Sequence, residues 1–169
     1  MLAFAEWLAS TPPSIMLAQS SWVVPTVQTV HIVVIAILWS SVLMVGLRVM
    51  GWAMPSQPLE ATVERFRPWF WGALAVLATT GIILIVTEPP RELMAVSFWL
   101  KMLMLAVAVA VALSFLRSID RNAASWETAP RPLTKVLGIV TFCLWCLVVF
   151  LGRFIAYDEQ IWGSFSAPH

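Results

Sequence analysis

The chain has 169 residues, of which 60% are hydrophobic and 11% are charged, and its formal net charge is +1. Soluble domains are nearer half apolar and a quarter charged, so this composition excludes an ordinary soluble protein and indicates an integral membrane protein. The near-neutral charge and the lack of a Lys- or Arg-rich tract give no sign of nucleic-acid binding.

The first predicted element is a short helix from Leu2 to Ala9 that lies in the membrane interface, with Trp7 as its anchor and Pro12 as its stop. Four apolar runs follow, each long enough to cross a bilayer core, which takes roughly 20 helical residues. The predicted spans are about 22–48, 69–87, 97–116 and 136–157. We therefore expect an all-α fold, an antiparallel four-helix membrane bundle with short interfacial N- and C-terminal segments, in a single transmembrane domain over residues 1–169.

The connections between these spans are predicted as follows. Residues 52–67 carry charges in a helix-compatible pattern that suits a surface segment, and Pro68 is expected to open the second span. Residues 88–92 are predicted to form a tight charged turn. The tail from Asp158 to His169 contains Ile161, Trp162 and Phe165 at a spacing that suits an interfacial turn.

Basic residues predict the orientation, because loops rich in Lys and Arg face the cytoplasm. The first and third loops hold most of them, so both termini and the short second loop are expected on the non-cytoplasmic side. The basic residues of the two loops are Arg48, Arg65, Arg67, Arg117, Arg121, Arg131 and Lys135.

His31 is the ionisable side chain that lies deepest in the first span, about 15 Å along the helix from Ser21. An ionisable residue at that depth is costly and marks a candidate functional site. Gln28 shares its helical face. With the predicted topology, three further polar residues fall in the same outer half of the bundle, namely Thr80, Lys101 and Arg153.

Two interpretations of this cluster compete. In the first, His31 only bonds a neighbouring helix, Thr80 bonds its own helix, and Lys101 reaches the headgroups. In the second, the cluster binds an anionic cofactor such as haem b. An imidazole then ligates the iron, while cationic or hydrogen-bonding groups (Lys101 and Arg153, with Gln28 or Thr80 as further partners) hold the propionates.

A second axial ligand for haem is not evident, because the only other histidine is His169 at the chain end. Haem at His31 would then be five-coordinate, ligated by His and Met, or shared across a subunit interface. Copper is the competing occupant, since Met94, Met102 and Met104 offer soft thioethers near the imidazole.

The spacing of Cys143 and Cys146 matches redox and metal pairs. However, reactive cysteines of that kind need an exposed thiolate at a helix N-terminus, and these two lie in mid-span. We expect them to serve in packing.

The runs over residues 20–51, 66–89, 98–111 and 147–157 resemble an uncharacterised family of small four-span bacterial inner-membrane proteins. That likeness covers nearly the whole chain and includes the G-R-x-x-A-Y ending that contains Arg153. It implies a bacterial inner-membrane location.

More distantly, the pattern of His31, Gly81 and Lys101 resembles the copper resistance protein D family and the HemJ-type protoporphyrinogen oxidases. The HemJ-type likeness implies a role for the histidine in haem binding and for the lysine in function. The copper-family likeness implies copper transport. The chain departs from both patterns in having no further intramembrane histidine.

The sequence therefore leaves three alternative functions, in order of preference. The first is a protein that binds haem b and serves in electron transfer, linked to quinone. The second is a copper-handling membrane protein, and the third is a non-catalytic subunit of a larger membrane complex. Metal ligation rests on His31 in the first two. Whether the protein is an enzyme, and whether it forms a homo-oligomer, stays open from the sequence.

Overall fold

The computed structural model describes residues 1–129 and 131–163, and every regular element in these ranges is a helix. Four helices are long and apolar enough to cross a membrane, which confirms the predicted four-helix fold of a multi-pass membrane protein. The long helices are α3 (Val23–Val49), α4 (Leu59–Thr87), α6 (Val96–Glu127) and α7 (Arg131–Phe154). The short ones are α1 (Leu2–Ala9), α2 (Pro12–Gln19), α5 (Pro89–Met94), η1 (Ile155–Tyr157) and α8 (Asp158–Trp162).

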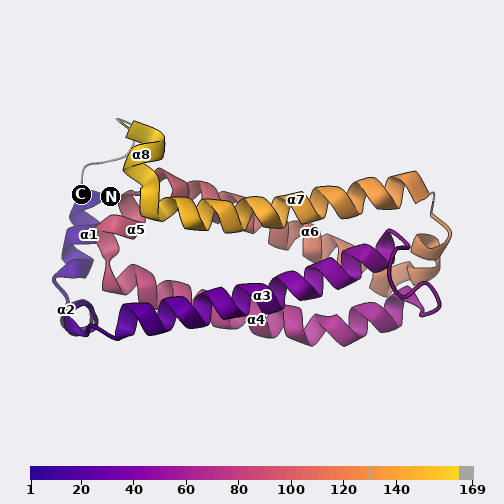
Figure 1. The fold of residues 1–169 in the computed structure, drawn as a ribbon, viewed down its shortest axis with the longest axis horizontal. Coiled ribbons are helices and arrows are strands. Elements are labelled where there is room, and N and C mark those ends of the chain that lie inside the picture. Colours follow the sequence, from indigo (N-terminus) through magenta and orange to yellow (C-terminus); the bar gives the residue numbers. More distant parts are fainter. Residues whose placement is uncertain (130, 164–169) are drawn as a thin grey trace.

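The long helices form two antiparallel hairpins, α3 with α4 and α6 with α7, which lie side by side (Figure 1). The short helices α1, α2, α5 and α8 gather at one end of the bundle, which we call the terminal end. The α3–α4 and α6–α7 connections lie at the opposite end, which we call the loop end. Helix α3 packs against α7 and helix α4 packs against α6, so the hairpins close into a bundle.

The helices continue beyond the predicted spans. Helix α4 begins at Leu59, so residues 60–67 extend it, and Pro68 lies inside the helix instead of opening it. The carbonyl that this proline leaves unbonded belongs to Glu64, which is exposed, and the break in the ladder is therefore tolerated. The predicted turn at residues 88–92 includes most of a short helix, α5, whose two prolines occupy the first turn where no N–H is needed. Phe165 and His169 lie outside the described residues.

The centre of the bundle is a hydrophobic cluster to which all four long helices contribute. Its buried members are Leu38, Phe70, Ala73, Ala108, Trp145 and Val148. The rings of Phe70 and Trp145 meet edge to face with centroids 5.8 Å apart, a favourable aromatic geometry. Large aliphatic side chains such as Ile32, Ile82 and Leu103 are exposed on the outer faces, which suits contact with lipid.

At the loop end, Arg48 ties three segments together. Its Nη2 donates to both carboxylate oxygens of Glu127, at 2.8 and 3.0 Å, and its Nε donates to the Gln57 carbonyl at 2.8 Å. Glu127 Oε1 also accepts the backbone N–H of Leu59, at 2.7 Å. The end of α3, the start of α4 and the end of α6 are thus joined through one ion pair.

At the terminal end, Asp158 caps α6 from a distant part of the sequence. Its carboxylate accepts the backbone N–H groups of Val96 (2.9 Å) and Ser97 (2.8 Å) at the first turn of α6. Trp162 Nε1 donates to Ser97 Oγ at 2.8 Å. A carboxylate at this position satisfies free N–H groups and interacts favourably with the helix dipole.

We expect Asp158→Ala to lower the free energy of unfolding by about 1–2 kcal/mol, the usual cost of a lost N-cap. The amides of Val96 and Ser97 should also exchange faster with solvent deuterium, because they lose their acceptor. Hydrogen exchange read out by mass spectrometry on detergent-purified protein checks this. Glu159→Ala, a change at the exposed neighbouring residue, is the control, and equal exchange in both variants would refute the capping role.

Candidate ligand site at His31

His31 lies on α3 and makes a hydrogen bond to α4. Its Nδ1 is 2.7 Å from Thr80 Oγ1, and Thr80 Oγ1 is in turn 2.8 Å from the Val76 carbonyl and 3.2 Å from that of Leu77. A threonine hydroxyl has one hydrogen to donate, and here it is directed to its own helix. Thr80 therefore accepts from His31, which assigns the ring proton to Nδ1 and the lone pair to Nε2.

The Nε2 atom of His31 makes no hydrogen bond within residues 1–129 and 131–163. Metal-bound histidines almost always donate their other ring N–H to a fixed partner, which holds the ring and its tautomer. The bond to Thr80 holds the His31 ring through Nδ1 in the same way.

Gly81 follows Thr80 and lies beside the same imidazole. A Cβ placed on Gly81 would be 3.9 Å from His31 Cε1, in ordinary van der Waals contact. Gly81 therefore lies directly beside Cε1 of the imidazole.

Lys101 on α6 supplies a cation near this imidazole. It lies close enough to His31 and to Glu92 for their charges to interact. Its amine packs against Gly152 of α7, where a Cβ would be 3.4 Å from Nζ. Lys101 makes no hydrogen bond or ion pair within 4 Å in the part of the chain that the structure describes, so its ammonium group can take an anionic partner.

Glu92 on α5 is a residue that the sequence did not single out. Burial raises the pKa of its carboxyl group, as does Glu88, while Lys101 and Arg91 act in the opposite direction. The sequence predicts only a tight charged turn at residues 88–92, which gives no sign of a buried carboxyl group. The helical form of α5 places this carboxyl group near Lys101 instead.

The structure brings together only part of the predicted cluster. His31, Thr80 and Lys101 lie near one another on three helices. Arg153 is exposed, with its guanidinium carbon 5.7 Å from the centre of the Tyr157 ring. Gln28 is also exposed and has no hydrogen bond among the described residues. Neither side chain makes a hydrogen bond or ion pair with the other three in the described part of the chain.

Two of the predicted copper ligands pack against different hydrophobic groups. Met102 packs against the group around Ala95, Phe98 and Ile155, whereas Met104 packs against the central cluster. No group of three His, Cys, Asp or Glu side chains that could hold a metal ion is found among residues 1–129 and 131–163. Both cysteines are free thiols, with Cys143 exposed. Near His31 the described residues thus offer one imidazole and one cation.

Residues 15–158 match DUF6644, a family of unknown function. The chain belongs to this family. The match confirms the predicted membership of an uncharacterised family, while the more distant likeness to the copper resistance protein D and HemJ-type families stays a prediction. A search of curated proteins finds no match, and a search of solved structures finds none either.

Proposed function

We propose that this DUF6644 protein binds haem b within its bundle and serves in electron transfer, with His31 Nε2 as the axial ligand of the iron. The observation that carries the proposal is the hydrogen bond from His31 Nδ1 to Thr80, because it leaves Nε2 as the lone-pair nitrogen. Haem bound here would supply a centre that accepts and gives one electron at a time.

The residues around His31 offer the charge and the hydrogen-bonding groups that haem b needs. Haem b carries two propionates, and Lys101 offers them an ammonium group without a hydrogen-bond partner in the described chain. The exposed Arg153 is not part of the proposal. No other histidine lies in a predicted span, so His31 is the histidine that would hold the group.

We further propose that the protein lies in the bacterial inner membrane with its terminal end on the non-cytoplasmic side. The two loops that hold most of the basic residues lie together at the loop end of the bundle, as the positive-inside rule requires of a cytoplasmic face. His31 lies towards the terminal end of α3, so this orientation places the haem nearer the non-cytoplasmic face.

Titration of the detergent-purified protein with haemin tests the proposal. We expect a saturable Soret band with one haem per chain, which shifts on reduction with dithionite. Copper-loaded protein analysed for metal in parallel should retain no stoichiometric copper. A titration indistinguishable from that of empty detergent micelles would overturn the proposal.

Thr80→Val tests the hydrogen bond between His31 and Thr80, on which the haem proposal rests. The change keeps the shape of the side chain but removes the acceptor of His31 Nδ1–H, and we expect haem affinity to fall about 10–100-fold. Thr79→Val is a matched control, because Thr79 is exposed and bonds only its own helix, 3.0 Å from the Ala75 carbonyl. The dissociation constants come from the same haemin titration, and equal values for the two variants would contradict the role of Thr80.

A further inference from the structure

A polar pocket lies on α6 at the loop end, beside a kink in this helix. The backbone of Asn122 leaves the helical conformation (φ −162°, ψ 81°). Beyond the kink, the Trp126 ring packs edge to face on Phe115 with centroids 4.9 Å apart, and its Nε1 donates to Ser118 Oγ at 2.9 Å. These contacts hold the end of α6 against the turns before the kink, where the pocket has a volume of about 390 Å³.

The pocket carries two positive charges that have no counter-charge. Arg117 and Arg121 are exposed, lie one turn apart on the same face of α6 and make no hydrogen bond or ion pair within the described ranges. No carboxylate is among the described lining residues, which are Ser114, Arg117, Ser118, Arg121, Asn122 and Ser125. The nearby acids of α6 are engaged elsewhere, since Asp120 pairs with Arg67 and Glu127 pairs with Arg48.

Ser118 and Asn122 add hydrogen-bond donors to this pocket. Ser118 Oγ accepts from Trp126, and its own hydrogen meets no acceptor among the described residues. Asn122 Oδ1 accepts the backbone N–H of Ser125 at 3.2 Å, which leaves the side-chain NH₂ group free to donate. Two guanidinium groups with a hydroxyl and an amide donor form a set that suits the oxygens of a phosphate group.

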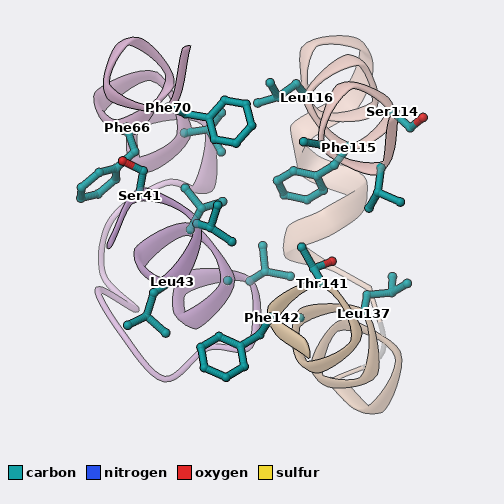
Figure 2. A pocket seen from close by; sticks show the side chains of 18 of the residues that line it. Ser41, Leu43, Phe66, Phe70, Ser114, Phe115, Leu116, Leu137, Thr141 and Phe142 are labelled. Carbon is teal, nitrogen blue, oxygen red and sulfur yellow. The ribbon is translucent and has the colours of Figure 1, made fainter. Parts of the chain in front are cut away.

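The face of α6 that leads to this pocket is apolar and exposed. Leu103, Val107 and Val111 are exposed, and their spacing places them on the same helical face as Ser114. In Figure 2, which looks into the apolar cavity between the two hairpins, Phe115 points towards the α3–α4 hairpin and Ser114 points away from it. The apolar face therefore lies on the outer side of the bundle, towards the lipid.

The pocket also lies at the level of the membrane surface. Arg117 follows Ser97, in the first turn of α6, by 20 residues, which is about 30 Å along the helix and equals the thickness of a bilayer core. A free phosphate ion would use only the polar pocket. A molecule with an anionic head and an acyl chain would use both the pocket and the apolar face above it.

We propose that this pocket binds an anionic phospholipid, with its phosphate on Arg117 and Arg121 and an acyl chain along Leu103, Val107 and Val111. Arginine binds phosphate through paired N–H groups, and basic pockets beside membrane helices are typical sites for anionic head groups. The site does not depend on haem at His31, because His31 lies towards the opposite end of the bundle.

Native mass spectrometry of the full-length protein in detergent tests the proposal by titration with phosphatidylglycerol or with phosphatidylcholine of the same acyl chains. We expect one tightly bound phosphatidylglycerol per chain, with a Kd at least about tenfold lower than that of phosphatidylcholine, whose head group is neutral overall. If the arginines only reach the general headgroup layer, the two lipids bind equally. Equal affinities would overturn the proposal.

A double variant, Arg117→Gln with Arg121→Gln, should remove this preference by weakening phosphatidylglycerol binding at least about tenfold. The matched control is Arg65→Gln with Lys135→Gln, which removes the same charge from exposed residues and should keep the preference. Circular dichroism checks the fold of both variants, and the comparison of the two lipids in the unaltered protein does not depend on either. Loss of the preference in both variants, or in neither, would overturn the proposal.

Inorganic phosphate distinguishes a lipid site from a site for a free anion. Protein loaded with phosphatidylglycerol is incubated with excess phosphate and exchanged into ammonium acetate before the measurement. We expect the lipid to stay bound, because phosphate makes none of the acyl-chain contacts with Val107 and Val111. Release of the lipid by phosphate would show a free-anion site and contradict the proposal.

Discussion

His31→Ala should abolish haem binding by the purified protein, with a loss of affinity of about 100-fold or more. The expected loss is larger than that for Thr80→Val, because removal of a ligand costs more than removal of the group that orients it. The spectrum should lose the Soret shift that marks iron–imidazole ligation. The fold should persist, since His31 is only partly buried and makes one side-chain hydrogen bond in the described chain.

His169→Ala is the control for this experiment, because His169 is the only other histidine in the chain. We expect its haem titration to match that of the unaltered protein. If His169→Ala lost haem while His31→Ala kept it, the ligand would lie in the tail. Circular dichroism of both variants would separate a loss of ligation from a loss of structure.

Arg48→Ala should produce the largest loss of stability. Arg48 is 8% exposed and is bonded to Glu127 and to the Gln57 carbonyl, so its removal leaves a carboxylate and a carbonyl without their donor. Breaking a buried ion pair costs about 3–5 kcal/mol, and the partial exposure of Glu127 places this case at the lower end. For a chain of this size, about 3 kcal/mol corresponds to a decrease in Tm of roughly 6–12 °C.

Thermal unfolding in detergent, followed by circular dichroism, measures this effect. Arg65→Ala is the matched control, because Arg65 is exposed and forms no ion pair within the described ranges. We expect its Tm to stay within about 1–2 °C of the unaltered protein, as for surface substitutions generally. A similar Tm for Arg48→Ala and Arg65→Ala would show that the ion pair does not hold the loop end together.

The fold could be predicted because the length of an apolar run is enough to identify a membrane-spanning helix. Residues 22–48 were predicted as the first span, and the helix runs over Val23–Val49. The length of the helices beyond the apolar region does not follow from hydropathy. Residues 60–67 are charged and precede a proline, so hydropathy and proline both favoured a break, yet Leu59–Thr87 is one helix. The ion pair of Arg48 with Glu127, which binds the first N–H of α4, joins residues far apart in sequence and could not be foreseen.

The candidate site was predictable in part for a similar reason. Depth along a helix follows from residue number, so His31, Thr80 and Lys101 could be placed at similar levels. The direction of a side chain around the helix does not follow from depth. For this reason depth alone does not reveal that Arg153 is exposed while Thr80 is buried.

The most direct test of the account is a haem titration of His31→Gly with and without added imidazole. If His31 Nε2 ligates the iron, this variant should bind haem weakly alone, and imidazole should restore the Soret spectrum by entering the space left by the side chain. Haem binding by His31→Gly equal to that of the unaltered protein, without imidazole, would contradict the account.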